Sequence, residues 1–248
     1  MAALGSTGTE HEAPLFLPAG DHSLFGVISS PPAPDGTGVL LLSGGVYVLN
    51  TNKNRMYVRL SRALTARGAR VLRLDYRGVG ESTGMIGDYA LDDPSPQDVR
   101  AGIDALLAAG ARRIAVVGSC YGARAAMHEA AADPSLYATV LLAPPVGDTG
   151  RGAVAQPGDV GPVFLDRVTT LWHRAVPTLF VYGEQDPYYA DFAACASGPL
   201  RPMLAEGSSL SVRVLPGQMH GLQRVPTQDA FVATALDFLT SIPAGAAR

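Results

Sequence analysis

The sequence predicts an α/β protein in which helices cover both faces of a mostly parallel central sheet. Short apolar runs rich in β-branched residues alternate along the chain with segments whose apolar residues recur at helical spacing. Several of the short runs are too uniformly apolar to leave one face in water, which is typical of strands inside a parallel sheet. With 248 residues, the chain has the length of one such domain.

Seven apolar runs are predicted to be strands, because each is short and is bounded by residues that favour turns. Several consist almost entirely of valine, leucine and isoleucine, so we place them in the centre of the sheet. The runs are residues 24–28, 38–42, 71–74, 113–117, 138–142, 178–182 and 210–215.

Amphipathic helices are expected between these strands. Segments 55–67 and 98–109 carry apolar side chains at helical spacing and are predicted to be crossover helices. Prolines just before the second segment favour its start, and Gly110 marks its end. An alanine-rich helix is expected after residue 120, and the last helix is predicted at 229–239.

The segment 144–175 differs in composition from the rest of the chain. Its first half, 144–161, is rich in Gly, Pro, Asp and Ala and is predicted to be a surface loop. Its second half is expected to form a short helix, because apolar side chains recur there at helical spacing, at Phe164, Val168, Leu171 and Trp172. We therefore predict that 144–175 forms a lid within a single domain rather than a second domain.

That single domain is expected over residues 14–248, after a disordered tail at 1–13. The 19 basic and 22 acidic residues give a formal net charge of −3. The arginines and the single lysine, Lys53, are scattered along the chain, which argues against nucleic acid as a partner. The composition does not fix an oligomeric state.

A cytoplasmic protein is expected. No apolar stretch approaches the roughly 18 residues that span a membrane, and the N-terminus lacks the basic and apolar regions of a signal peptide. The two cysteines, Cys120 and Cys195, are too few for a disulfide framework and lack the spacing of a zinc site. We therefore expect two free thiols in a reducing compartment, no metal and no cofactor.

The most informative segment is RIAVVGSCYGARAAMHEAA, residues 113–131, which predicts a strand, a tight turn and a helix around the pattern GxCxG. In such a turn the flanking glycines are needed because a Cβ would collide with the neighbouring backbone. Cys120 would then project at the N-terminus of the following helix, whose positive end lowers the pKa of a thiol. Cys120 is our candidate nucleophile.

Two alternatives to this assignment remain open. The pattern also fits an ordinary glycine-bracketed turn that contains a buried cysteine. Ser119 is a second candidate nucleophile, although only residue 120 lies two positions from both Gly118 and Gly122.

A nucleophile of this kind needs a base and an acid, which are expected to follow it along the chain in the order acid, base. Asp186 is the preferred acid, because it lies in the loop after the strand at 178–182; Glu184 is the alternative, and Asp191 is expected in the next helix. His220 is the candidate base, since it lies in the loop between the strand at 210–215 and the last helix.

The remaining histidines and the second cysteine lie outside this order. His173, in the predicted lid, is the one of them that could approach a substrate, although it breaks the order as a base. Cys195 lies among alanines and is best explained as a small packing residue. The other three histidines are in the tail, before the first strands and within the helix after the turn: His11, His22 and His128.

Backbone N–H groups on two loops are candidates for binding a developing oxyanion. One is that of Tyr121, directly after the nucleophile, and the other is that of Gly45 or Val46 in the loop after the strand at 38–42. Glycine residues in that loop allow close approach to a substrate carbonyl. An ordinary strand-to-loop turn remains the alternative for this segment.

The order of strands, turn, acid and histidine over about residues 24–240 resembles the α/β-hydrolase superfamily. The strings LLSGG at 41–45 and NRMYVRLSRALTARGARVLRLDYRGVGES at 54–82, with the cysteine turn, are similar to the small hydrolases associated with the exosortase A system, over about residues 39–143. Dienelactone hydrolases, a more distant resemblance, also place cysteine in this turn. The usual His-Gly pair of the oxyanion loop is replaced here by Ser43-Gly44, which leaves the second oxyanion donor open.

The resemblance implies a hydrolase or acyltransferase that acts on a small or carrier-bound ester or thioester through an acyl-cysteine. Selectivity is expected from aromatic side chains in the lid and the loops: Tyr47, Trp172, Tyr188 and Tyr189. Opening of a lactone is an alternative, for which Arg124 is the nearest candidate to bind a charged substrate. A non-catalytic scaffold that binds a small ligand is a further alternative.

Overall fold

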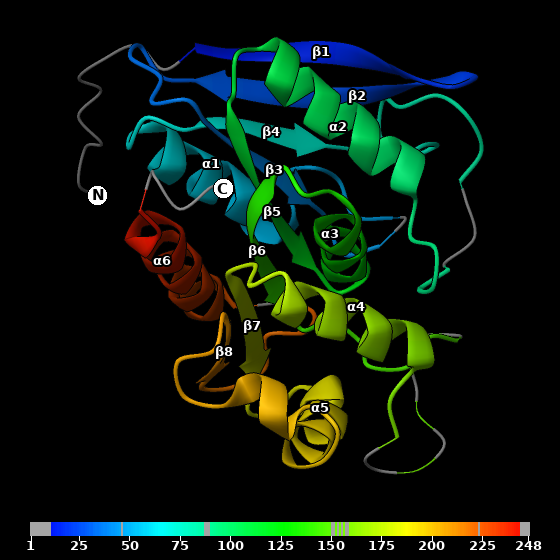
Figure 1. Cartoon of the computed structure of the whole chain (residues 1–248). Coiled ribbons are helices and arrows are strands. Elements are labelled where there is room, and N and C mark those ends of the chain that lie inside the picture. Colours follow the sequence, from blue (N-terminus) through cyan, green and yellow to red (C-terminus); the bar gives the residue numbers. More distant parts are fainter. Residues whose placement is uncertain are drawn as a thin grey trace.

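In the residues that this computed structural model describes (11–45, 47–86, 90–149, 152, 154, 156, 159–222 and 224–243), eight strands form one sheet (Figure 1). Their order across the sheet is β1-β2-β4-β3-β5-β6-β7-β8. The strands are β1 (His11–Ala19), β2 (His22–Ser30), β3 (Thr37–Leu42), β4 (Arg70–Leu74), β5 (Arg113–Ser119), β6 (Leu136–Leu142), β7 (Thr178–Gly183) and β8 (Leu210–Leu215).

The strands from β4 to β8 run parallel, which confirms the predicted parallel sheet. Every residue of β3, β6 and β7 is buried, in agreement with their mostly apolar sequences. All seven predicted strands are present, each with bounds within three residues of the prediction.

The prediction omitted one edge strand, β1, which forms an antiparallel hairpin with the predicted strand β2. Residues 11–13, which the sequence analysis assigned to a disordered tail, pair with β2 as the start of β1. The first half of β1 is mostly exposed and contains Pro14, so it lacks the apolar pattern of a buried strand. Its position depends on backbone hydrogen bonds to β2, and these are not visible in its own sequence.

Helices cover both faces of the sheet. On one face lie α1 (Met56–Thr65) and α6 (Val225–Ser241), whose buried side chains join one apolar cluster. Apolar side chains of the helices on the other face join a second cluster, and Figure 1 shows these helices together on that face: α2 (Pro96–Ala108), α3 (Tyr121–Ala132), α4 (Pro162–His173) and α5 (Pro187–Ser197). None of the described helices is long and apolar enough to cross a membrane.

The segment predicted to be a lid contains α4, which packs along α3 (Figure 1). Phe164, Val168 and Leu171 are buried in this contact. The carboxylate of Asp148 accepts hydrogen bonds from the backbone N–H groups of Val163 and Phe164, at 2.7 and 3.1 Å, and so caps the first turn of α4. Helix α4 thus belongs to the helical layer on this face of the sheet.

The carboxyl ends of the parallel strands meet at one edge of the sheet. The loops after β3, β5, β7 and β8 all leave the sheet at this edge. They carry Gly44, Cys120, Asp186 and His220 respectively. Residues far apart in the sequence are therefore brought together here.

Candidate active site

Cys120 lies in a strained turn between β5 and α3. Its backbone has φ 50° and ψ −112°, a conformation that non-glycine residues rarely adopt. A Cβ added to Gly118 would lie 2.0 Å from the carbonyl oxygen of Gly122, and one added to Gly122 would lie 2.3 Å from that of Leu42. Both glycines are therefore required by close backbone contacts, as the pattern GxCxG predicts.

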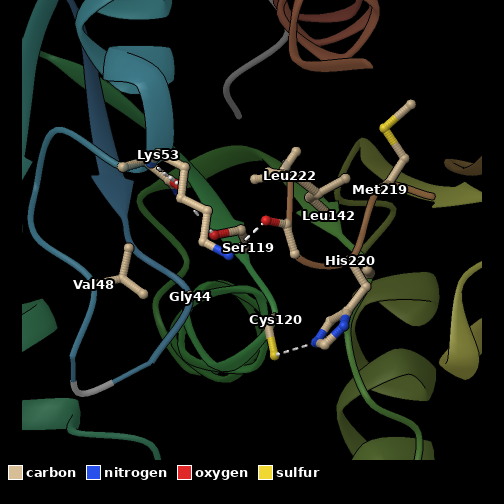
Figure 2. A pocket seen from close by; sticks show the side chains of 12 residues that line it. Gly44, Val48, Lys53, Ser119, Cys120, Leu142, Met219, His220 and Leu222 are labelled. Atoms are coloured by element: carbon tan, nitrogen blue, oxygen red, sulfur yellow. Dashed lines mark hydrogen bonds between the residues drawn. The ribbon is translucent and has the colours of Figure 1, made fainter. Parts of the chain in front are cut away.

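The thiol of Cys120 contacts the ring of His220, with 3.6 Å between Sγ and Nε2. Figure 2 shows the two side chains pointing toward one another from the loops after β5 and β8. In the neutral imidazole, an unprotonated Nε2 can accept the thiol proton. The pair therefore has the geometry for proton transfer from sulfur to nitrogen.

Asp186 is buried beside this pair, with 4% of its surface exposed. Its carboxylate accepts hydrogen bonds from the backbone N–H groups of Gly183, Met219 and His220, at 2.6, 2.7 and 2.5 Å. The expected direct contact with the imidazole is not seen: in the described part of the chain, no hydrogen bond or ion pair joins the two side chains. Asp186 instead fixes the backbone that carries His220.

Glu184, the alternative acid, occupies a different position. Its side chain is exposed, and its Oε1 accepts a hydrogen bond of 3.2 Å from the backbone N–H of Gly217. Asp191 lies within α5, as expected. Of the three acids considered, Asp186 is the one whose carboxylate binds the His220 backbone.

Three features of its surroundings determine the protonation of His220. Burial lowers its pKa below the ordinary value of 6.5, the charge of Asp186 opposes this shift, and the charge of Lys53 adds to it. The ring also meets the Tyr188 ring edge to face, with 4.8 Å between centroids. The imidazole is thus held in the neutral form that a base needs near pH 7.

A cavity of about 180 Å³ opens beside the thiol and the imidazole (Figure 2). Much of its wall is apolar and comes from three separate segments, the loop after β3, the end of β6 and the loop after β8: Val48, Leu142, Ala143, Met219 and Leu222. A small cavity that combines an apolar wall with a few polar groups is typical of a site for a small molecule.

The polar lining of the cavity includes groups that the sequence analysis did not select. Lys53 Nζ donates a hydrogen bond of 2.6 Å to the carbonyl oxygen of Gly221, and Asn52 Nδ2 lies 3.4 Å from the hydroxyl of Ser119. Asn52 and Lys53 follow no recognised motif. That Lys53 is the single lysine of the chain was the only signal available in the sequence.

The loop that brings these residues to the cavity is held by a buried polar cluster. Asn50 donates to both carboxylate oxygens of Asp75, from its backbone N–H at 2.5 Å and its Nδ2 at 2.7 Å. Arg73 donates to Asn50 Oδ1 at 2.9 Å, and Ser43 donates to the carbonyl oxygen of Leu49 at 2.8 Å. Because these groups are buried and mutually bonded, the loop after β3 has a defined path.

The structure locates the candidate oxyanion donors only in part. Tyr121 is the first residue of α3, directly after Cys120. The backbone N–H of Gly45 donates a hydrogen bond of 3.0 Å to the carbonyl oxygen of Ser43, so in this structure it is directed at the protein's own backbone. Val46 lies outside the described residues. Gly44 lies beside the nucleophile, since a Cβ there would lie 3.4 Å from the Cβ of Cys120.

Two of the aromatic residues selected for substrate contact lie apart from the cavity. Tyr47 is 82% exposed, and the Trp172 ring contacts that of His173 at a tilt of 42°, with 4.8 Å between ring centroids. Neither lines the cavity within the described part of the chain. Tyr188 lies against His220, whereas Tyr189 packs against the buried ring of Tyr182.

Arg124, considered as a binding group for a charged substrate, is buried away from the cavity. It forms an ion pair of 2.6 Å with Asp148 and donates to the carbonyl oxygens of Leu91 and Pro145, at 2.8 and 3.1 Å. Its guanidinium also lies over the Phe164 ring. Arg124 therefore joins α3 to the segment before α4 and is not available to a ligand.

The other thiol and histidines lie elsewhere. Cys195 is buried, its Sγ lies 3.3 Å from the carbonyl oxygen of Asp159, and burial raises its pKa. His22 contacts Asp98, His128 contacts Arg167, and His11 begins β1. Among the residues with described positions, no group of three or more His, Cys, Asp or Glu side chains is arranged to hold a metal ion.

Comparison with known proteins identifies the family of this chain. A family model for the alpha/beta hydrolase family matches residues 39–245. The chain therefore belongs to the α/β-hydrolase family, and it is an enzyme of the hydrolase type. No curated protein sequence matches it significantly.

Solved structures with the same fold include three enzymes of different description. The esterase Pf2001 of Pyrococcus furiosus has a TM-score of 0.69 and 17% identity, over 94% of this chain and 93% of that one. The serine hydrolase XC6422 of Xanthomonas campestris, described as lacking a lid, has a TM-score of 0.65 and 20% identity, over 98% and 99%. A dienelactone hydrolase of Anabaena variabilis has a TM-score of 0.66 and 16% identity, over 94% and 98%. At these identities, the likeness is one of fold.

Proposed function

We propose that this hydrolase cleaves or transfers the acyl group of an ester or thioester through an acyl-Cys120 intermediate. The observation that carries the proposal is the 3.6 Å contact between Cys120 Sγ and His220 Nε2 at a strained turn before a helix. A thiol next to an imidazole and a helix N-terminus is readily converted to the thiolate, which is the nucleophilic form.

In the first step, His220 takes the thiol proton and the sulfur attacks the substrate carbonyl carbon. The oxyanion that forms is bound by the backbone N–H of Tyr121 and a donor from the loop containing Gly44 to Val46. As the carbonyl re-forms, the bond to the leaving group breaks, and the imidazolium returns the proton to that alcohol or thiol. Cys120 is then acylated.

In the second step, water or another nucleophile attacks the thioester carbon while His220 accepts its proton. The sulfur leaves as a thiolate and takes back the proton, so that the free acid, or the transferred ester or amide, is released. An acyl-cysteine is itself a thioester and remains reactive toward an alcohol or amine. The cysteine therefore suits acyl transfer as well as hydrolysis.

Asp186 supports both steps in two ways. Its carboxylate fixes the backbone N–H of His220, which sets the position of the ring relative to Cys120. Its negative charge also stabilises the imidazolium that forms in each step, in agreement with its raising effect on the pKa of His220.

The test is intact-mass spectrometry after brief exposure to a panel of p-nitrophenyl esters and thioesters. We expect one acyl group on the wild-type chain, located at Cys120 by peptide mapping, and none on Cys120→Ala. His220→Ala should retain its fold by circular dichroism but acylate several powers of ten more slowly. Acylation of Cys120→Ala at the wild-type rate, for example at Ser119, would overturn the proposal.

A further inference from the structure

Lys53 places a positive charge in the wall of the candidate active site. Figure 2 shows its side chain extending toward Ser119 and the loop that carries His220. Lys53 Nζ donates to the carbonyl oxygen of Gly221 at 2.6 Å, and the same cavity is lined by the thiol of Cys120. A group bound at the ammonium and a carbonyl at the thiol would occupy one continuous space.

This charge lacks a carboxylate partner. In the described residues, no aspartate or glutamate forms an ion pair with Lys53, and none lines the cavity. Lys53 is an exposed residue, so its ammonium is open both to solvent and to the cavity that it lines. A primary ammonium has three N–H donors, and the Gly221 carbonyl uses one of them.

The position of Lys53 is also defined by the backbone. Its N–H donates to the Asn52 side-chain oxygen at 2.6 Å, at the start of a short 3-10 helix, Lys53–Arg55. The side chain is anchored at its other end by Gly221. These two hydrogen bonds order an exposed side chain, so presenting the ammonium to the cavity costs little further entropy.

We infer that Lys53 binds an anionic group, of carboxylate size, on the substrate. This inference rests on the proposed function and narrows its substrates to esters or thioesters that carry a second, negatively charged group. That group lies either in the acyl part or in the leaving group. The sequence analysis considered Arg124 for binding a charged substrate. Arg124 is paired with Asp148, so we assign the binding of the anionic group to Lys53.

The first test measures how fast two small alkylating agents modify Cys120. Iodoacetate and iodoacetamide react alike, since the sulfur bonds to the CH₂ carbon and iodide leaves, but only iodoacetate is anionic. We expect the ratio of the two modification rates, iodoacetate over iodoacetamide, to be higher in the wild-type chain than in Lys53→Gln. Lys53→Gln should lower that ratio roughly fivefold, and added salt should lower it in the wild type.

Two control variants separate charge at this site from net charge. Lys53→Arg keeps the positive charge and should keep most of the ratio. Arg67→Gln removes an equal charge from an exposed side chain on a different part of the surface, and should leave the ratio unchanged. An equal fall in Arg67→Gln, or an unchanged ratio in Lys53→Gln, would overturn the inference.

The second test identifies which part of the substrate carries the charge. Three thioesters are compared: butyryl-N-acetylcysteamine, succinyl-N-acetylcysteamine and the butyryl thioester of 3-mercaptopropionate. Lys53→Gln should lower kcat/KM roughly fivefold more for one of the two anionic thioesters than for the neutral one, mainly through KM. The affected compound shows whether the acyl part or the leaving group meets Lys53.

A purely structural role for Lys53 gives a different result. If the ammonium only anchored the Gly221 loop, Lys53→Gln would lower kcat/KM equally for all three compounds, and the inference would be wrong. Failure of the proposed function is separate from this, because it would appear as absence of acylation at Cys120 in the wild-type chain with every donor.

Discussion

Asp186 accepts a hydrogen bond of 2.5 Å from the backbone N–H of His220, and so fixes the loop that carries the imidazole. The same carboxylate oxygen binds the backbone N–H of Met219, at 2.7 Å. Because Asp186 is buried and its oxygens already bind the backbone, its removal would free the His220 loop as well as the charge near the ring. Orientation of the base is thus a property of the loop between β8 and α6.

The acidic limb of the pH profile should shift in opposite directions in two variants. Activity requires neutral His220 and falls as the pH drops through its pKa. Asp186 raises this pKa and Lys53 lowers it, so Asp186→Asn should move the limb to lower pH and Lys53→Gln to higher pH.

The measurement is kcat/KM against pH for a neutral p-nitrophenyl ester. Glu184→Gln is the matched control, since it removes an exposed carboxylate two residues from Asp186, and its limb should coincide with that of the wild type. A shift in the same direction for Asp186→Asn and Lys53→Gln would contradict the assignment of the limb to His220.

Iodoacetamide should modify Cys120 much faster than Cys195. Cys120 is partly exposed and contacts His220, whereas Cys195 is buried and burial raises its pKa. We expect a rate difference of roughly a hundredfold or more, read by peptide mapping after short exposure at pH 7. Equal modification of both thiols in the folded protein would show that the turn does not activate Cys120.

Gly122→Ala should destabilise the protein strongly. The new Cβ would lie 2.3 Å from the carbonyl oxygen of Leu42 and 2.5 Å from that of Ser43, so the turn, the helix or the strand must move. We expect a loss of about 3 kcal/mol or more in the free energy of unfolding, measured by urea denaturation.

Gly207→Ala provides the comparison for that measurement. Gly207 has φ 78° and no atom within 4 Å of an added Cβ, so its substitution should cost only the left-handed backbone strain, about 1 kcal/mol. Similar losses in the two variants would mean that the close contact at Gly122 can relax.

Cys120→Ser should lower acyl transfer more than hydrolysis. A hydroxyl ionises far less readily than a thiol, whose ordinary pKa is about 8.5, so acylation should slow. The intermediate becomes an oxyester, which resists attack by an amine or alcohol better than a thioester does. We expect the acylated variant to accumulate in the intact-mass spectrum, whereas full transfer by Cys120→Ser would mean that the thiol has no special role.

The order of Cys120, Asp186 and His220 could be predicted from the sequence because each lies in the turn or loop that follows a strand recognisable from its own composition. Such strands are recognised from local composition, and parallel strands end at the same edge of a sheet. The glycines at 118 and 122 likewise indicate a tight turn wherever the chain folds. These features are local, so the sequence alone determined the fold class and the candidate catalytic residues.

Only the tertiary structure decided what surrounds them. Lys53 and Asn52 reach the cavity because buried Asp75, after β4, binds Asn50 in the loop after β3, a contact between separate strand ends. Trp172 packs in the helical layer although its spacing suggested a lid residue, and β1 exists through its pairing with β2. Long-range hydrogen bonds and packing of this kind leave no periodic pattern in the sequence. The residues that line the site are therefore determined by the tertiary structure.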